Sequence, residues 1–229
     1  FLDRNEKRIS SQNEEYIREL TEQRAISIDN LFEENLSFIK ATAYLYGNSL
    51  SSPAADIQTI KEYEESTVFD MLRFIDRNGD NYTSQGVISN LADRAYFQSG
   101  LRGEAGITYV LKSRVTGQRQ IGFYSPVYYD NEIIGVMVGF FGEDYINRLL
   151  EFELFGSRGE SWLCDKDGTV LGTTVVERLN EAQDQSFENF FSYLTGMDRV
   201  AEDGMEVIRD AFEKGGSIDF YYNDAGDEA

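Results

Sequence analysis

The sequence contains no histidine and only one cysteine, Cys164. Histidine is the side chain that most often serves as a general base or a metal ligand, so its absence excludes Ser-His-Asp and Cys-His catalysis. A single cysteine cannot form a disulfide within the chain. Because Cys164 follows Trp162 and Leu163, we predict a buried thiol on a strand. These absences argue against an enzyme of the common nucleophilic types.

Positive charge is also scarce, with 21 lysines and arginines against 41 aspartates and glutamates and a formal net charge of −20. Such a surface repels nucleic acid phosphates and anionic headgroups, and no basic stripe offsets it. We therefore expect no nucleic-acid partner. The acidity keeps the protein soluble, and an anionic ligand would need a locally positive pocket.

Long apolar runs are missing as well. The longest run, Ile133–Phe141, is interrupted by Gly135 and Gly139, and it is far shorter than the roughly 20 residues of a membrane-spanning helix. The sequence begins with Phe1 rather than Met. We expect the membrane spans of the protein to lie outside this segment.

What the sequence does contain is a long helical pattern at its start. No proline occurs in residues 1–47, and Gly47 is the first glycine. Apolar residues recur there at intervals of three or four, with charged residues between them, which predicts an amphipathic helix from about residue 3 to 47. The first half is too polar to be well buried, so we expect it to project or to pair with a second copy of the chain. A short helix is expected over residues 57–65.

The period changes in residues 68–150. A strand before the turn Asp76–Gly79, a helix over 93–101, and strands at 107–111, 120–127 and 133–141 are predicted. The turns Thr116-Gly117 and Asp130-Asn131 suit tight hairpins, and a helix over 143–152 follows. Strands grouped around helices in this way indicate an α+β fold with an antiparallel sheet.

A second unit begins after Gly156 and repeats part of the first. The sequence from Trp162 to Gly168 matches that from Arg73 to Gly79 in its apolar-apolar-Asp-basic-Asn/Asp-Gly pattern, 89 residues further on (from Asp76 to Asp165). The repeat predicts two separate sheets that start with similar hairpins. Helices at about 183–194 and 198–213 and a strand at 217–222 are expected next. No returning strand follows the turn at 223–227, so we expect the second module to be incomplete.

Both repeated turns also resemble the start of a calcium-binding loop. However, the twelfth position, where such a loop needs glutamate, holds Val87 in the first turn and Val176 in the second. We therefore interpret Asp76 and Asp165 as turn residues and expect no bound metal.

The segment Asp93-Arg94-Ala95-Tyr96-Phe97-Gln98-Ser99-Gly100-Leu101-Arg102-Gly103 resembles the signature of the double Cache (PAS-like) sensor family. Ser125-Pro126-Val127 and Ile133-Ile134-Gly135-Val136 fit the strands that follow it in that family. The resemblance implies a long N-terminal helix carrying two tandem PAS-like modules. We expect a stalk helix at 1–47, a membrane-distal module at 48–155 and a truncated membrane-proximal module at 156–229.

The resemblance also implies a function. Such domains lie on the extracytoplasmic face of the bacterial cell membrane and feed histidine kinases, diguanylate cyclases and chemoreceptors. We expect a non-catalytic sensor without a cofactor that binds a small molecule in its distal module. The alternatives are an extracellular interaction or adhesion module without a small-molecule ligand and, less favoured, a carboxylate-based hydrolase.

Within the resembling segment, Arg94 is the first candidate ligand-binding residue, because its planar guanidinium can donate two parallel hydrogen bonds to a carboxylate. Tyr96 and Phe97 would supply walls. Tyr109, Tyr124 and Phe140, on the three following strands, are expected to face the same cavity. For each aromatic residue core packing is the alternative, and Phe123 or Ser125 replaces Tyr124 if the strand points the other way.

The amino-acid-binding members of the family have a sharper pattern: a tyrosine five residues before the arginine, tryptophan and tyrosine after it, and an aspartate on the last strand. Here these places hold Ser89, Tyr96, Phe97 and Phe140. Without the aspartate, a buried α-ammonium group would lack its counter-charge. We therefore predict an anionic ligand, with a flat heterocycle stacked on Phe140 as the alternative, and no amino acid.

Overall fold

The computed structural model describes residues 2–108, 111–114, 117–150, 161–174, 189–196 and 202–214. Two compact units are present, the central unit (residues 26–145) and the terminal unit (residues 1–25 and 146–229). The helices are α1 (Leu2–Ser49), α2 (Ile57–Ser66), α3 (Ala95–Leu101), α4 (Glu143–Leu150), α6 (Phe190–Gly196) and α7 (Glu202–Lys214). The strands are β1 (Met71–Asp76), β2 (Asp80–Thr83), β3 (Gly86–Asn90), β4 (Gly106–Ile107), β5 (Leu111–Lys112), β6 (Arg119–Tyr129), β7 (Glu132–Gly142), β8 (Trp162–Cys164) and β9 (Val170–Thr173). The predicted α+β class is confirmed.

The long helix α1 ends two residues beyond its predicted boundary. Its stripe residues Ile28, Leu36, Ile39, Ala43 and Tyr46 are all buried in the central unit. Gly47 is required by close packing, because a Cβ atom there would lie 2.1 Å from the carbonyl oxygen of Tyr128. The glycine therefore lets the end of α1 approach β6. No helix among the described residues is both long enough and apolar enough to cross a membrane.

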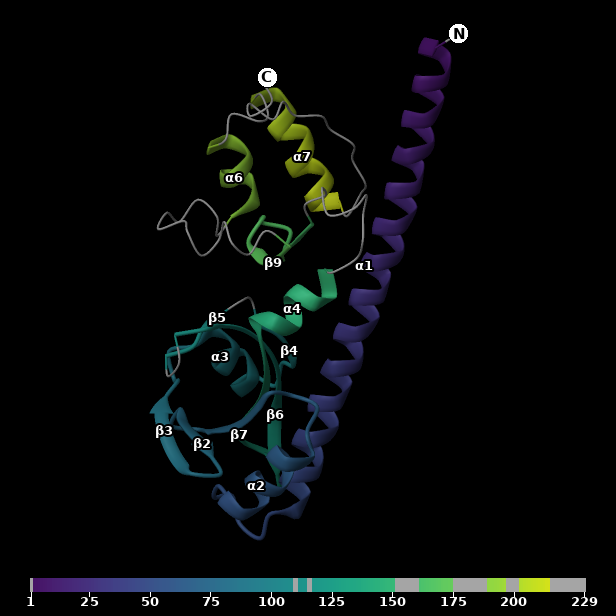
Figure 1. The fold of residues 1–229 in the computed structure, drawn as a ribbon. Coiled ribbons are helices and arrows are strands. Elements are labelled where there is room, and N and C mark those ends of the chain that lie inside the picture. Colours follow the sequence, from purple (N-terminus) through teal and green to yellow (C-terminus); the bar gives the residue numbers. More distant parts are fainter. Residues whose placement is uncertain are drawn as a thin grey trace. The chain divides into compact units, whose positions relative to one another are not determined.

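The central unit is built on an antiparallel sheet in the order β3-β2-β1-β7-β6-β4, with β5 pairing further along β6. Helices cover both faces of it (Figure 1). On the α1 side, the ring of Phe123 packs edge-on against Phe32 at 5.6 Å. On the other side, Val136, Val138 and Phe140 pack with residues of α3. Because both faces are covered, β6 and β7 are continuously buried over most of their length.

The hairpins of this sheet follow from their turn residues. Asp130 and Asn131 have positive φ angles of 49° and 65°, as a two-residue hairpin between β6 and β7 requires. The predicted β1–β2 hairpin is also present, with Phe74 opposite Tyr82. The helix predicted over 93–101 begins only at Ala95, because Arg94 precedes it in an extended conformation.

The structure differs from the sequence prediction at two strands. Strand β3 was not expected from the sequence. The single strand predicted at 107–111 is instead two short strands, because the Thr108 side chain accepts from the Gly122 N–H (2.8 Å) while its own N–H donates to the Gly122 carbonyl (2.7 Å), which ends the regular ladder. Of the helix predicted at 183–194, residues 183–188 lie outside the described residues. The helix α6 begins at Phe190, since Asn189 bridges to Thr169 and its side chain caps the first turn.

In the terminal unit, β8 and β9 form a separate two-stranded sheet, as the repeat predicts. Phe191, Tyr193, Leu194, Met205 and Ile208 form its core. Cys164 lies on β8 as expected, but the residue is half-buried rather than buried. This burial raises the pKa of its thiol to about 12. The strand predicted at 217–222 and the turn at 223–227 lie outside the described residues, as do 151–152 of the predicted helix 143–152 and Thr116 of the predicted turn.

Candidate functional site

A cavity of about 90 Å³ lies in the central unit, against the sheet face that packs on α3. Its position follows from the sheet order, since residues from β3, β2, β1, β7, β6 and β5 all contribute to it. The lining residues are Met71, Arg73, Asn81, Ile88, Ser89, Leu91, Arg94, Tyr96, Leu111, Ser113, Arg114, Gln120 and Phe140. This volume is well below the roughly 300–1,000 Å³ of pockets for drug-sized ligands, so the cavity suits a small molecule.

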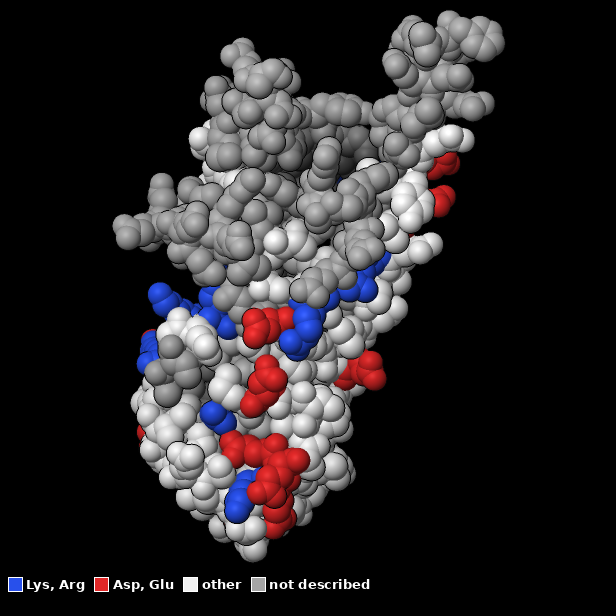
Figure 2. Space-filling view, in the orientation of Figure 1, with Lys and Arg blue, Asp and Glu red and all other residues white. Residues whose placement is uncertain are grey.

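The charged side chains that line the cavity are positive. Arg73, Arg94 and Arg114 line the cavity, and among the described residues no aspartate or glutamate does. In a chain of net charge −20, three guanidinium groups at one cavity give a local potential opposite to that of the whole protein. The face of the molecule in Figure 2 shows acidic side chains gathered over the central unit, with smaller groups of lysine and arginine side chains near them.

Arg94 is placed by the start of α3. It is the N-cap residue, with an extended backbone (φ −74°, ψ 131°), and its Nη2 donates to the carbonyl oxygen of Lys112 at 3.2 Å. Among the described residues, no carboxylate lies within ion-pair distance of Arg94. Its positive charge is thus available to a ligand.

The other two arginines are paired with carboxylates outside the lining. Arg114 binds Asp93 through both of its terminal nitrogens, with Nη1 at 2.9 Å from Oδ1. The hydrogen bonds from Arg114 hold the pKa of Asp93 below its usual value. Arg73 binds Glu64 of α2, with Nη1 at 2.7 Å from Oε1. Together, the three lining arginines and the two carboxylates paired with them carry a net charge of +1.

Aromatic rings form the apolar part of the lining. Tyr96 of α3 packs against Phe140 of β7 in an edge-on contact at 6.2 Å, and against Tyr124 of β6 at 6.0 Å. Burial raises the pKa of Tyr96 to about 12, so its hydroxyl remains protonated at physiological pH. A buried phenol of this kind can donate a hydrogen bond to a ligand without adding negative charge.

The sequence matches the model of the Cache domain family (dCache_1) over residues 5–228. The chain is a Cache domain. Membership in this family makes it a sensor domain, and both sequence halves of the predicted double module fall within the match.

Solved structures of chemoreceptor ligand-binding domains share the fold. The ligand-binding domain of the Campylobacter jejuni chemoreceptor Tlp3, solved with 4-methylisoleucine, is 18% identical, with a TM-score of 0.60 over 73% of this chain and 72% of that chain. The domain of the Pseudomonas aeruginosa PAO1 amino acid chemoreceptor PctC, in complex with GABA, is 15% identical, with a TM-score of 0.60 over 71% and 76% of the two chains. The Pseudomonas fluorescens CtaA domain with L-serine is 17% identical, with a TM-score of 0.59 over 71% and 72%. No curated protein matches the chain.

In this Cache domain, only some of the sequence-predicted residues line the cavity. Arg94, Tyr96 and Phe140 line the cavity together. Tyr124 lies on the same sheet face, in the cluster behind the lining. Phe97 belongs to that cluster and is only 2% exposed, so it packs in the core rather than at the cavity. Tyr109 lies outside the described residues.

The strand register also decides between the alternatives for β6. Tyr124 packs against Tyr96 on the cavity side, whereas Phe123 packs against Phe32 of α1 on the opposite face. Because neighbouring residues of a strand alternate, Ser125 shares the α1 side with Phe123. Neither of them can replace Tyr124.

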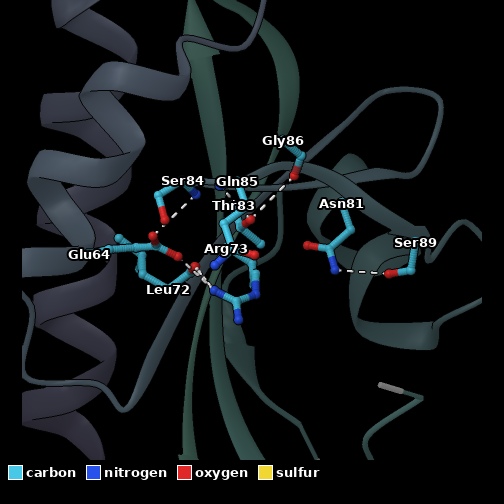
Figure 3. Close-up of polar contacts among 9 residues, drawn as sticks. All are labelled: Glu64, Leu72, Arg73, Asn81, Thr83, Ser84, Gln85, Gly86 and Ser89. Atoms are coloured by element: carbon cyan, nitrogen blue, oxygen red, sulfur yellow. Dashed lines mark hydrogen bonds and ion pairs between the residues drawn. The ribbon is translucent and has the colours of Figure 1, made fainter. Parts of the chain in front are cut away.

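Sequence reasoning missed the polar residues on the first strands. Arg73 of β1 and Asn81 of β2 both line the cavity, and they lie close to the β2–β3 turn (Figure 3). The signal for Arg73 was present, because a lone arginine stands between Leu72 and Phe74 in an apolar strand. A charged residue among buried neighbours needs a partner, and here Glu64 provides it. Nothing in the sequence singles out Arg114.

Proposed function

We propose that this Cache domain is the extracytoplasmic ligand-sensing region of a bacterial membrane receptor, and that it binds a small anionic molecule in the cavity at Arg94. The observation that carries the proposal is the lining, whose described residues include three arginines and a buried tyrosine but no carboxylate. The planar fork of Arg94 can donate two parallel hydrogen bonds to a carboxylate. Ligand binding would favour one of two arrangements of the domain, and helices would carry that change toward the membrane.

The lining supports an anion rather than an amino acid, although the related domains from C. jejuni and P. fluorescens were solved with amino acids. An α-ammonium group in this cavity would face guanidinium groups and no lining carboxylate. Leaving such a charge buried without a counter-charge costs several kcal/mol. Position 140, where the amino-acid-binding pattern needs aspartate, carries the phenylalanine that forms the apolar lining.

The receptor context belongs to the same proposal. We expect the domain to regulate a histidine kinase, a diguanylate cyclase or a chemoreceptor module outside this segment, as the family resemblance implies. The exposed side chains of Tyr16, Ile17 and Ile26 on α1 support pairing with a second copy of the chain. Sedimentation equilibrium over a range of protein concentrations tests that pairing.

The ligand proposal is tested by a thermal-shift screen of small carboxylates followed by calorimetry. We expect Arg94→Ala to weaken binding of an active carboxylate by about 1.5–3 kcal/mol, roughly ten- to a hundredfold, because a hydrogen-bonded charge is lost. The matched control is Arg102→Ala at the other end of α3, since Arg102 pairs with Glu104 on the surface. Equal affinities of wild type and a folded Arg94→Ala variant would reject Arg94 as the anion-binding residue.

A further inference from the structure

The cavity has two different ends. At one end lie Arg94, Arg114 and Ser113, next to β5, and at the other lie Arg73, Asn81 and Ser89, on β1, β2 and β3. Phe140 of β7 lies between them, because β7 separates β1 from β6 in the sheet. Three strand steps of about 4.8 Å each separate β1 from β5, and the long arginine side chains that line the cavity at both ends shorten the remaining span. A ligand of a few carbon atoms can therefore contact both ends while packing on Phe140.

The charge at the β1–β3 end is already balanced. The Arg73 and Glu64 side chains are only 17% and 19% exposed and lie 2.7 Å apart. Glu64 is fixed from a second direction, because its Oε2 accepts a hydrogen bond from the Ser84 N–H at 3.2 Å (Figure 3). Burial lowers the pKa of Arg73, and the adjacent Glu64 offsets this. A second ligand carboxylate would have to compete with Glu64 for the same guanidinium.

The same end contains an unsatisfied acceptor. Asn81 is 5% exposed, and its Nδ2 donates to Ser89 Oγ at 3.0 Å. In the part of the chain that the structure describes, its Oδ1 is buried and has no hydrogen-bond partner. In Figure 3 this oxygen points to the side on which Arg73 lies. A buried acceptor without a donor is unfavourable, so a ligand that brings a donor to this place gains from it.

We propose that the β1–β3 end is a second subsite, formed by Arg73 and Asn81, for a neutral group that both donates and accepts hydrogen bonds. The ligand class is a small monocarboxylate whose far end carries an amide or a similar neutral polar group. Its carboxylate binds Arg94, as in the proposed function on which this inference rests. At the far end the ligand oxygen accepts from Arg73, and its N–H donates to Asn81 Oδ1.

The charges of the side chains exclude a second carboxylate and an ammonium group at the far end of the ligand. The three lining arginines and the two carboxylates paired with them carry a net charge of +1, which one ligand carboxylate balances and two do not. A ligand ammonium group at the far end would meet Arg73, whose carboxylate partner is not part of the lining. Glu64 thus acts as a positioning residue that sets the specificity of the subsite, without contacting the ligand itself.

Calorimetry on the full 229-residue chain tests this with probes of equal chain length: succinamate, succinate, 4-aminobutyrate and pentanoate, each also one methylene longer. They differ only in the far end, which is an amide, a carboxylate, an ammonium or an alkyl group. We expect the amide probe of the better-fitting length to bind roughly tenfold or more tightly than its three counterparts.

The deciding variant is Glu64→Gln, which removes the charge that balances Arg73 and keeps a similar shape. We expect it to reverse the preference, so that the dicarboxylate binds more tightly than the amide. Glu65→Gln is the matched control, because Glu65 lies on the same helix and is 68% exposed. Loss of a merely structural contact would weaken all probes alike and would not reverse their order. Should Glu64→Gln fail to fold, Asn81→Leu tests the same subsite, and it should abolish the advantage of the amide over pentanoate.

Equal or tighter binding of succinate or 4-aminobutyrate to the wild-type chain overturns the subsite, and so does binding of none of the probes. Both results leave the proposed function intact if another carboxylate binds in an Arg94-dependent way. Binding of the probes that Arg94→Ala leaves unchanged contradicts the proposed function instead.

Discussion

The two units start their sheets with the same turn but surround it with different side chains. Asp76 Oδ1 accepts from the backbone N–H groups of Asn78 and Asp80, and Asp165 Oδ1 accepts from those of Asp167 and Thr169. The match extends beyond the sequence repeat. Asn90 donates to the Asn78 carbonyl in one unit, and Asn189 donates to the Asp167 carbonyl in the other.

The differences show why the described cavity lies in the central unit. Arg73 and Trp162 are equivalent, because each lies three residues before the aspartate of the shared turn. Arg94 and Tyr193 are equivalent, because each lies four residues after the shared asparagine. The rings of Trp162 and Tyr193 lie 4.7 Å apart within the core of the terminal unit. Two arginines that line a cavity in one unit are thus replaced by two aromatic rings that pack together in the other. The shared framework thus supports a cavity lined by arginines in one unit and packed aromatic rings at the corresponding positions of the other.

The largest expected effects come from the glycines of the two turns. A Cβ at Gly79, where φ is 87°, would lie 2.6 Å from the backbone nitrogen of Ala92. At Gly168, where φ is 79°, it would lie 2.5 Å from the Phe191 ring. We expect Gly79→Ala to cost about 3 kcal/mol or more of unfolding free energy, and Gly168→Ala about 2–3 kcal/mol, because a side chain can adjust more easily than backbone.

Urea denaturation separates the two effects. Trp162 is the only tryptophan and lies in the terminal unit. The urea midpoint read by its fluorescence should therefore fall in the Gly168→Ala variant and stay unchanged in the Gly79→Ala variant, whereas circular dichroism reports on both units. Trp162 fluorescence that shifts equally in the Gly79→Ala variant would show that the units unfold as one body, and the comparison between them would then fail.

A smaller effect is expected from the shared asparagines. Asn90 also accepts from the Ala92 N–H at 3.1 Å, and Asn189 from the Phe191 N–H at 3.0 Å. Because both bind backbone groups in the same way, Asn90→Ala and Asn189→Ala should each cost about 1–2 kcal/mol of unfolding free energy. Denaturation curves read by circular dichroism check this. Costs that differ by more than about 1 kcal/mol would mean that the shared contacts are not energetically equivalent.

The sequence predicts those parts of the fold that local rules determine. The absence of proline and early glycine predicts α1, and Asp130-Asn131 predicts the β6–β7 hairpin. Strand β3 was missed because it lies at the sheet edge and alternates poorly, with Val87 and Ile88 both exposed. At the site, the family signature identified Arg94 and Tyr96. Arg73 and Asn81 could not be found, because the face to which a strand residue points depends on a register that only the folded sheet fixes.

The smallest effect concerns a pair that one unit has and the other lacks. Three residues after the shared asparagine, the central unit has Asp93 and the terminal unit has Ser192. Arg114 lowers the pKa of Asp93 in the folded protein. A carboxyl group whose folded pKa is depressed contributes stability above its unfolded pKa, about 3.9 for aspartate, and that contribution disappears as the pH falls through the folded pKa. Asp93→Asn should therefore lower the melting temperature slightly at pH 5–7, and the difference from wild type should shrink as the pH falls below about 4 and vanish below the folded pKa. Both side chains of the pair are exposed to solvent, so the effect should also shrink at high salt.

Ser192→Ala is the matched control, since a hydroxyl group does not titrate in this range and any difference it causes should be constant with pH. A melting-temperature difference for Asp93→Asn that persisted unchanged to pH 3 would mean that Asp93 stabilises the unit through its shape or hydrogen bonds rather than through its charge.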